Sequence, residues 1–347
     1  MKALVKLKRG PGNVELIDRP EPELADNEVM IRVKSAGICG TDVKIWDELT
    51  WSNPPVTLGH EFSGVVERVG SAVRDFKPGD RVLSETPQVV CGKCEFCKTG
   101  HFMMCKGRLS IGYGVDGAFA ELIKVREAIV HKLPDGLDFN TAALCEPLAV
   151  AVHAVYDNVE ILPTHTVGVM GPGPIGQLVA QVVQARGAKT VVLGTGCDGE
   201  RLALASRLGA DAVLVTTEDD FAEKAAKAAP NGFDIVFDCS GAQPAINAGL
   251  GLLRNMGTLV QVGLTKPQVM LDYGQFPSRE LRLFGSFGHR PANWDQALTL
   301  LVEGKIHVDG IIAKDYELED WEQAFNDMKA QKGIKLMLHP NGMPEKE

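Results

Sequence analysis

The sequence lacks the usual features of membrane insertion, secretion and disorder. It has no apolar stretch long enough to cross a bilayer, no basic-then-apolar leader in MKALVKLKRG, no low-complexity segment and no internal repeat. Its net charge of −9 is spread without long blocks of one sign, which disfavours nucleic acid and anionic membranes as partners. With 45% hydrophobic and 23% charged residues over 347 positions, we expect a globular cytoplasmic protein of two domains that acts on small molecules.

Half of the eight cysteines fall in one short segment, CGKCEFCKTGHFMMC. They are Cys91, Cys94, Cys97 and Cys105. This spacing can bring four thiolates round one tetrahedral ion, so it predicts a structural zinc site. An iron–sulfur cluster is the alternative, but its last cysteine is typically three residues on and followed by proline. Here seven residues separate Cys97 from Cys105. In a reducing cytoplasm no disulfides are expected.

The pattern of apolar residues changes twice along the chain. Up to about residue 155, β-branched runs such as EVMIRVKSAG are interrupted by Gly, Pro and Asp, which is typical of a turn-rich β domain. From about residue 166, apolar strands such as TVGVM alternate with helical stretches such as GQLVAQVVQARGA, which indicates βαβ units and a parallel sheet. From about residue 290 the pattern is mixed: NWDQALTLLVEGKI and LEDWEQAFNDMKA predict helices, and IKLMLHP predicts a closing strand.

A glycine-rich turn joins the strand TVGVM to the helix that follows it. It consists of Gly171, Pro172, Gly173, Pro174, Ile175 and Gly176. Glycines at this spacing permit a tight turn and let the backbone approach a pyrophosphate held at the helix N-terminus. The strand before and the helix after the turn therefore predict a dinucleotide-binding site.

The end of the next strand leaves the choice of dinucleotide open. NAD sites usually have an acidic residue there, which bonds the ribose hydroxyls, but TVVLGTGCDGERL has Thr195 at that position. Arg201 could bind the 2′-phosphate of NADP, although Asp198 and Glu200 oppose an anion. The sequence is compatible with both NAD and NADP.

Two further clusters precede the cysteine segment. AGICGTD contains Cys39, and GHEFSG contains His60 and Glu61. A cysteine or a histidine alone is more often a buried core residue than a ligand. A thiol, an imidazole and a carboxylate together form a ligand set suited to zinc.

Taken together, these motifs resemble those of a known family. GHEFSGVVERVGSAV is similar to the signature of the zinc-dependent medium-chain alcohol dehydrogenases, and GICGTD, the four-cysteine segment, GPGPIG and LEDWEQAF extend the resemblance over essentially the whole chain. The segment CEPL, residues 145–148, resembles the sorbitol (L-iditol) and threonine dehydrogenase branch. There Glu146 stands where classical alcohol dehydrogenases have a third zinc-binding cysteine, so Glu146 is a candidate ligand and Cys145 a less favoured one.

The resemblance implies an α/β fold with a GroES-like, β-rich catalytic domain and a Rossmann domain with a parallel sheet. The catalytic domain would comprise residues 1–155 and 290–347, with the structural zinc lobe at 91–105, and the Rossmann domain would comprise residues 156–289. The implied cofactors are two zinc ions per chain and NAD or NADP. The implied assembly is a homo-oligomer, either a dimer or a tetramer.

The resemblance also assigns the site residues. Cys39 and His60 would bind the catalytic zinc. Glu61 and Glu146 would either share the remaining protein positions or exchange with water and substrate, and one position must stay open. The dinucleotide would contact the glycine motif and four further residues: Thr195, Arg201, Val262 and Ser286.

At the open position zinc would polarise the substrate oxygen, and hydride would pass from the carbinol carbon to the nicotinamide. Thr41 would accept the alcohol proton and Asp42 would orient His60, with ordinary turn roles as the alternative. Many relatives relay the proton through a histidine where this chain has Lys44. A normal lysine is protonated at neutral pH and cannot accept a proton. Either another group or water completes the relay, or Lys44 has a lowered pKa, or it binds an anionic substrate group; the remaining alternative is a lysine solvated on the surface.

Three functions are compatible with these residues. The first is oxidation of a polyol or sugar alcohol with NAD(P), which Glu146 in the EPL segment favours. The second is an L-threonine 3-dehydrogenase type of reaction, in which Lys44 or Arg290 would bind the substrate carboxylate. The third is a non-enzymatic zinc and dinucleotide-binding protein, which would not need Cys39, His60, Glu61 and Glu146 together.

Four more residues are candidates for the substrate pocket. Trp46 and Trp51 flank the polar segment DELT and would either wall a pocket or pack in the core. His289 and Arg290 follow the last expected strand of the Rossmann domain. They would either bind polar substrate groups or lie at an interface or surface.

Overall fold

The computed structural model describes residues 1–343, which form two compact units. Unit 1 comprises Met1–Glu146, Arg290–Leu298 and the described chain from Val308 onward, and unit 2 comprises Pro147–His289 and Thr299–His307. Within the described residues, no helix is both long and apolar enough to cross a membrane.

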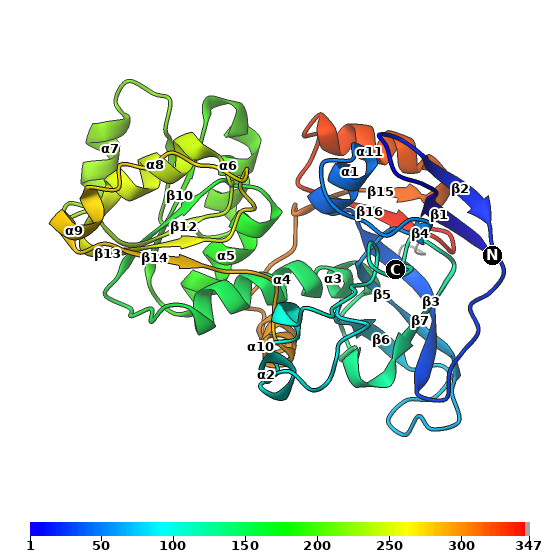
Figure 1. Ribbon diagram of the computed structural model, residues 1–347. Coiled ribbons are helices and arrows are strands. Elements are labelled where there is room, and N and C mark those ends of the chain that lie inside the picture. The colour runs from blue at the N-terminus through cyan, green and yellow to red at the C-terminus, as the bar shows by residue number, and fades with distance from the viewer. Residues whose placement is uncertain (344–347) are drawn as a thin grey trace. The chain divides into compact units, whose positions relative to one another are not determined.

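Unit 1 is built mainly from antiparallel strands (Figure 1). One sheet has the order β2-β1-β4, and a larger one has the order β15-β16-β3-β5-β6-β8, with β7 paired to β3. The strands are β1 (Lys2–Lys6), β2 (Val14–Asp18), β3 (Glu28–Gly37), β4 (Val56–Thr57), β5 (Glu61–Val69), β6 (Arg81–Ser84), β7 (Leu122–Arg126), β8 (Val130–Lys132), β15 (Ile312–Glu317) and β16 (Lys335–His339). The turn-rich β character expected for the first 155 residues is confirmed.

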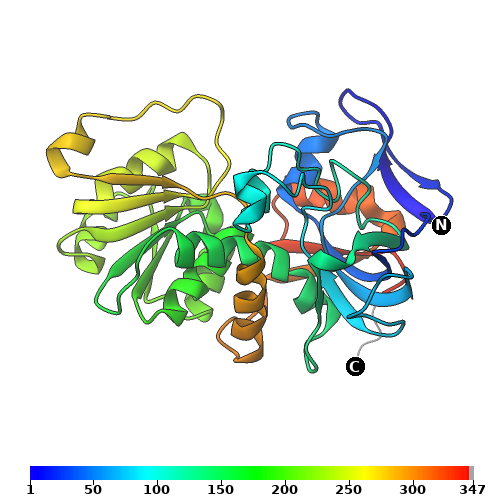
Figure 2. The ribbon, with the colours of Figure 1, turned by 60° about the horizontal axis from the view of Figure 1, so that its bottom comes forward.

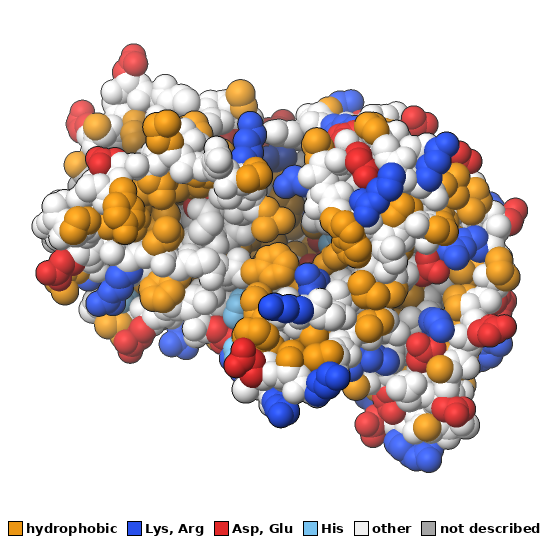
Figure 3. All heavy atoms as spheres, viewed as in Figure 1, with side chains coloured by type: hydrophobic (Ala, Val, Ile, Leu, Met, Phe, Trp, Pro, Cys, Tyr) orange, Lys and Arg blue, Asp and Glu red, His pale blue; other side chains and the backbone are white. Residues whose placement is uncertain are grey.

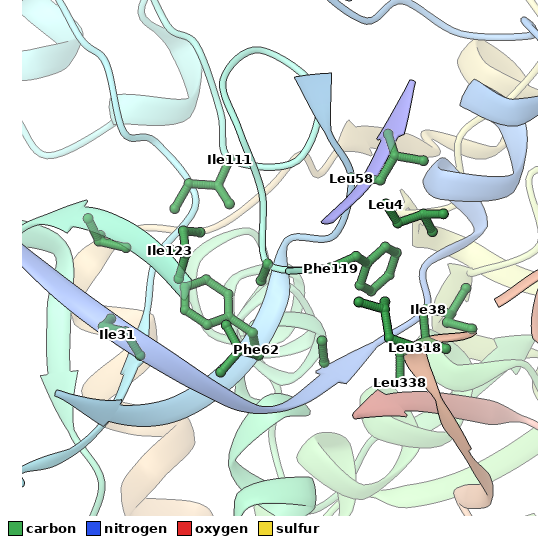
Figure 4. Close-up of a cluster of buried hydrophobic side chains, with 14 of the residues drawn as sticks. Leu4, Ile31, Ile38, Leu58, Phe62, Ile111, Phe119, Ile123, Leu318 and Leu338 are labelled. Atoms are coloured by element: carbon green, nitrogen blue, oxygen red, sulfur yellow. The ribbon is translucent and has the colours of Figure 1, made fainter. Parts of the chain in front are cut away.

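The core of unit 1 lies between these strands and the segments that cross them. Figure 4 shows Phe119 among the aliphatic side chains of Leu4, Leu58 and Leu338, and Phe62 from β5 in another part of the same cluster. All five are almost completely buried. Burying side chains of this size contributes about 1.5–3 kcal/mol each, so this cluster holds together strands that are distant in sequence.

Short helices complete unit 1. They are α1 (Gly40–Trp46), α2 (Glu95–Lys98), α3 (Phe139–Ala143) and α11 (Trp321–Lys329), while α4 (Cys145–Val152) and α10 (Pro291–Val302) contribute residues to both units. Helices α10 and α11 and strand β16 confirm the elements expected near the C-terminus. The rings of Trp46, Trp321 and Phe325 meet edge to face with centroids 5.5–5.8 Å apart, which joins α1 to α11.

Unit 2 is a six-stranded parallel sheet in the order β11-β10-β9-β12-β13-β14. Its strands are β9 (Thr166–Met170), β10 (Lys189–Gly194), β11 (Ala212–Val215), β12 (Phe233–Asp238), β13 (Leu253–Gln261) and β14 (Arg282–Gly285). Its helices are α5 (Pro174–Ala185), α6 (Gly199–Arg207), α7 (Phe221–Ala228), α8 (Gln243–Leu252) and α9 (Gln275–Arg279). Figure 2 shows helices packed against the sheet. The expected α/β fold with a parallel sheet is confirmed.

The order of the sheet in unit 2 locates its binding edge. The chain builds outward from β9 through β10 to β11, then returns to the other side of β9 with β12. In sheets of this type ligands bind at the carboxyl ends of the strands where the order reverses. The turn after β9 lies at that point, and it contains the glycine motif.

Candidate active site

Strand pairing in unit 1 brings together Cys39, His60 and Glu61. Cys39 follows β3, and His60 and Glu61 stand at the start of β5, which is antiparallel to β3 with Gly37 opposite Glu61. One potential ligand atom from each residue lies within 4.8 Å of the others. His60 and Glu61 are buried and Cys39 is half-buried. A half-buried thiol together with a buried imidazole and a buried carboxylate at this separation fits a zinc ion.

Gly37 is required by this arrangement. A Cβ atom at Gly37 would lie only 2.4 Å from Oε2 of Glu61. Glycine therefore gives the Glu61 carboxylate room to lie across the neighbouring strand.

Asp42 faces His60 from the first turn of α1 and is fully buried. Its Oδ2 accepts a hydrogen bond of 2.8 Å from the backbone N–H of Cys39, while its Oδ1 lies 3.6 Å from Nδ1 of His60. The second distance is too long for a hydrogen bond. Burial lowers the pKa of His60, but the charges of Asp42 and Cys39 outweigh it and shift that pKa well upward. The imidazole is thus in a strongly anionic environment that favours a cation, either a proton or a metal ion.

A buried lysine pairs with Glu61. Nζ of Lys335, the first residue of β16, lies 2.8 Å from Oε1 and 2.5 Å from Oε2 of Glu61, and it also donates to the carbonyl of Ile38 at 3.1 Å. Burial lowers the pKa of Lys335, but the attraction of Glu61 outweighs it and the net shift is upward. The sequence analysis missed Lys335. The only local indication was a charged residue opening the otherwise apolar strand IKLMLHP.

Glu146 and Thr41 lie close to this group without belonging to it. Glu146, in the first turn of α4, is outside the set of atoms within 4.8 Å, but it interacts electrostatically with His60 and Glu61. Removal from water raises the pKa of Glu146 to about 7; His60 lowers it and Glu61 raises it. Thr41 is the second residue of α1 and is partly exposed. The roles expected for Glu146 and Thr41 remain predictions.

The structure also describes the surroundings of three further candidates. Lys44 is exposed on α1. Trp46 packs against α11 and has the ammonium of Lys329 at 3.9 Å from its ring centroid, so core packing rather than a pocket wall describes its surroundings. Trp51 is 51% exposed.

The four cysteines of the 91–105 segment form a second group whose sulfur atoms lie within 4.8 Å of one another. Sγ of Cys97 lies 3.5 Å from that of Cys94 and 3.9 Å from that of Cys91. Hydrogen bonds from the backbone N–H groups of Lys93 and Cys94 lower the pKa of Cys91 to about 6. Four sulfur atoms clustered at these distances suit a structural zinc ion.

The glycine motif of unit 2 forms a tight turn between β9 and α5. Gly171 has a φ of +92°, and a Cβ atom at Gly176 would lie 1.9 Å from the carbonyl oxygen of Gly171. A Cβ atom at Gly173, the residue before the helix, would meet nothing within 4 Å. Pro174 and Ile175 open α5. The turn is therefore tightly packed where Gly176 approaches Gly171 and open at Gly173, as a pyrophosphate-binding turn requires.

A carboxylate lies beside Thr195 just after the end of β10, although Thr195 itself replaces the acidic residue that is usual in NAD sites. Oδ2 of Asp198 accepts hydrogen bonds of 2.8 Å from both the backbone N–H and the hydroxyl of Thr195. Arg201 lies on the following helix with Nη1 3.8 Å from Oδ1 of Asp198. From the sequence, Asp198 was considered only as a charge that opposes an anion. The fold of this turn places its carboxylate beside Thr195, and the sequence did not indicate this.

The other expected dinucleotide contacts lie at the same edge of the sheet. Val262 follows β13 and donates its backbone N–H to the carbonyl of Asp238 at 2.9 Å. Ser286 follows β14, and its hydroxyl accepts a bond of 3.1 Å from Nδ2 of Asn158. Both residues are largely buried. His289, which the sequence left as a substrate-binding, interface or surface residue, is buried as well.

Comparisons with known proteins agree with this geometry. The alcohol dehydrogenase GroES-like domain matches residues 25–135, and the zinc-binding dehydrogenase domain matches residues 174–303. The chain is 38% identical to sorbitol dehydrogenase of Halalkalibacterium halodurans over 98% of this chain and 99% of that protein. It belongs to the zinc-dependent medium-chain alcohol dehydrogenases.

Two further relatives extend the comparison. D-arabitol-phosphate dehydrogenase of Enterococcus avium is 40% identical over 98% of each chain. The structure of a zinc-binding dehydrogenase from Sinorhizobium meliloti bound to NADP has a TM-score of 0.89, with 31% identity over 98% of this chain and 99% of that one. The chain is accordingly an NAD(P)-dependent enzyme with zinc as its metal cofactor, and the expected family and enzyme class are confirmed.

Proposed function

We propose that this enzyme transfers hydride between a secondary alcohol of a polyol and NAD(P). The observation that carries the proposal is the group formed by Cys39, His60 and Glu61, in a chain whose unit 2 has a dinucleotide-binding turn. Relatives that support it carry the names sorbitol dehydrogenase, D-arabitol-phosphate dehydrogenase and probable D-xylulose reductase. The alternative, a protein that binds zinc and dinucleotide without catalysis, would not need the Cys39, His60 and Glu61 group next to the partly exposed Thr41.

The residues of the site have distinct tasks in this reaction. Cys39 and His60 would hold the zinc ion, which when bound supplies a Lewis acid for the substrate oxygen. Thr41, which is partly exposed, would accept the hydroxyl proton of the substrate while its own hydroxyl proton passes to water. Asp42 holds the start of α1 through the N–H of Cys39 and presents its second oxygen to His60. Lys335 holds Glu61 in place, which leaves Glu146 as the further carboxylate able to approach the metal.

A substrate screen tests the proposal directly. Zinc-loaded enzyme would be assayed with neutral polyols, polyol phosphates and L-threonine, each with NAD and with NADP, by the absorbance of the reduced nicotinamide. Turnover of one or more polyols or their phosphates is expected. Turnover of L-threonine alone would assign the enzyme to the amino alcohol class instead. Absence of turnover with every substrate would refute the proposed polyol function.

We also propose that the enzyme works as a homo-oligomer, either a dimer or a tetramer. Strand β14 is the edge strand of the sheet in unit 2, and all four of its residues are exposed, including Leu283 and Phe284. Figure 3 shows hydrophobic side chains gathered over this part of unit 2. An edge with unpaired backbone groups and exposed apolar side chains favours pairing with a second copy. Light scattering on Leu283→Lys and the parent would test this, since the variant should be smaller.

Two further assignments belong to this proposal. The cytoplasm is the proposed location, because the thiolates of the four-cysteine segment must stay reduced to bind zinc. The proposed domains are residues 1–155 with 290–347 and residues 156–289. Fractionation of cells and limited proteolysis would test the two assignments separately.

A further inference from the structure

Asp238 is the last residue of β12 in unit 2, and its side chain is completely buried. Its Oδ1 accepts hydrogen bonds from the hydroxyl of Ser240 at 2.7 Å and from the backbone N–H of Ser240 at 3.3 Å. Its Oδ2 accepts from the backbone N–H of Gly241 at 2.8 Å and from Nε2 of Gln261 at 2.6 Å. Donors thus surround both oxygens, and an ionised carboxylate can accept on both.

The backbone of Asp238 strengthens the same connection. Its carbonyl accepts from the N–H groups of Val262 at 2.9 Å and Gly263 at 2.8 Å. Gln261 is the last residue of β13, and its Nε2 donates onward to the carbonyl of Gly263 at 2.7 Å. Asp238 therefore joins the turn after its own strand to the segment that follows β13.

These two segments also pack against each other and against the glycine motif. A Cβ atom at Gly263 would clash with the backbone nitrogen of Gly241. A Cβ atom at Gly171 would lie 2.9 Å from the Cβ atom of Ser240. The turn that Asp238 holds is therefore a direct neighbour of the first glycine in the pyrophosphate-binding turn.

The order of the sheet indicates which half of the dinucleotide meets this turn. Strand β10, which ends next to Thr195, lies on one side of β9, and β12 and β13 lie on the other side. A dinucleotide crosses a sheet of this type at the point where the strand order reverses, with its pyrophosphate at the glycine turn. Since the adenosine ribose is expected at the end of β10, the nicotinamide half is expected over the ends of β12 and β13.

Asp238 itself does not contact the dinucleotide in this arrangement. Its carboxylate is buried, and the N–H groups of Ser240 and Gly241 are directed at it. Donors engaged in this way do not serve to bind a phosphate group. The effect of the carboxylate on the ligand therefore passes through the backbone that it holds.

We propose that Asp238 is a positioning residue, which holds the turn 239–241 and the segment 261–263 in the arrangement that receives the nicotinamide half of the dinucleotide. This inference concerns dinucleotide binding and does not depend on which alcohol the enzyme oxidises.

The test compares NADH with ADP-ribose, which lacks the nicotinamide. Asp238→Asn keeps the size of the side chain but turns an NH2 group toward donors. Zinc-loaded parent and variant would be titrated calorimetrically with both compounds, and with NADPH and 2′-phospho-ADP-ribose as a second pair. In Asp238→Asn the Kd for the reduced dinucleotide should rise about 10-fold, while that for the ADP-ribose compound stays within about threefold.

A carboxylate at the other end of the same strand provides a matched control. Oδ2 of Asp234 accepts from the backbone N–H of Thr166 at 2.8 Å, and its Oδ1 accepts from Nε of Arg254 at 2.6 Å. It also joins neighbouring strands, but at their amino ends, away from the binding edge. Asp234→Asn should therefore lower the melting temperature without changing the ratio of the two Kd values.

A second variant covers poor folding of Asp238→Asn. Gln261→Met keeps a side chain of similar length and removes one of the four hydrogen bonds to the carboxylate. It should raise the ratio of the Kd for NADH to the Kd for ADP-ribose in the same direction, and less than Asp238→Asn does.

The outcomes separate a positioning role from a structural one. Equal losses of affinity for NADH and ADP-ribose would show that Asp238 acts on the pyrophosphate turn, and the inference would be wrong. A lower melting temperature with both Kd values unchanged would leave Asp238 a structural residue only, which also overturns it. A parent that binds NADH but oxidises no polyol would refute the proposed function, whereas these titrations would still decide the role of Asp238.

Discussion

Nζ of Lys335 lies 2.8 Å and 2.5 Å from the two carboxylate oxygens of Glu61, and both side chains are at most 3% exposed. The lysine enters from β16 and the glutamate from β5, and both strands flank the end of β3 from which Cys39 follows. An ion pair removed from water in this way costs desolvation energy, which only the mutual attraction and the added bond to Ile38 offset. The pair therefore couples the position of Glu61 to the closing strand of unit 1.

Lys335→Met should lower the free energy of unfolding by about 3–5 kcal/mol, because it leaves the Glu61 carboxylate buried without a partner. Urea denaturation followed by circular dichroism measures the change. The double variant Lys335→Met with Glu61→Met should recover part of the loss, since no buried charge remains. A loss below about 1 kcal/mol in the single variant would show that Glu61 is not held by this lysine.

Cys105→Ser, or removal of zinc from the four-cysteine segment with a chelator, should destabilise unit 1 while the Cys39 site keeps its own metal. The segment 91–105 is held by sulfur atoms rather than by an extensive apolar core, so we expect the melting temperature to fall by roughly 5 °C or more. Elemental analysis should show two zinc ions per parent chain and one in the variant. Folded variant with an unchanged melting temperature and no turnover would contradict the structural assignment.

His60→Ala should remove the catalytic zinc and lower turnover by roughly 1000-fold, while dinucleotide binding at the turn of Gly171 and Gly173 persists. Glu146→Ala should lower the turnover more than it lowers the zinc content, because Glu146 lies outside the group of Cys39, His60 and Glu61. Zinc content, dinucleotide affinity and polyol oxidation would be measured for both variants. Near-normal turnover in His60→Ala would disprove the assignment of this imidazole.

Thr195→Asp should shift the preference toward NAD by roughly tenfold, because its carboxylate could bond the ribose hydroxyls and would repel a 2′-phosphate. Arg201→Ala should lower the affinity for NADP more than that for NAD. The ratio of kcat/KM for the two dinucleotides is the measurement. Asp198 already lies beside Thr195, so Thr195→Asp combined with Asp198→Asn is the control for repulsion between neighbouring carboxylates.

Asp327 should stabilise the protein in a pH-dependent way. The hydrogen bond from the hydroxyl of Tyr316 and the ammonium of Lys332 lower the pKa of Asp327 from 3.8 to about 2. Because the unfolded chain binds the proton first as pH falls, this contribution is complete above pH of about 4 and is lost as pH falls toward about 2. The difference in free energy of unfolding between the parent and Asp327→Asn should shrink over that interval. A difference that is constant with pH would contradict the lowered pKa.

Features that depend only on neighbouring residues could be predicted from the sequence. The spacing of Cys91, Cys94 and Cys97 restricts where their sulfur atoms can lie, and the turn from Gly171 to Gly176 needs only local glycines. The alternation of apolar strands and helices in the middle of the chain likewise indicated the parallel sheet. These patterns sufficed for the fold class and the enzyme family.

Which distant groups meet at the site depends on how the strands and segments pack in three dimensions. Lys335 reaches Glu61 because β16 and β5 both lie against β3, and a shift of one residue in either pairing would turn those side chains to opposite faces. The ring of Tyr113 meets that of His60 because a glycine at position 112 lets its segment contact the backbone of Gly59. Such contacts depend on strand register and close packing between segments far apart in the chain, which no local pattern of residues specifies.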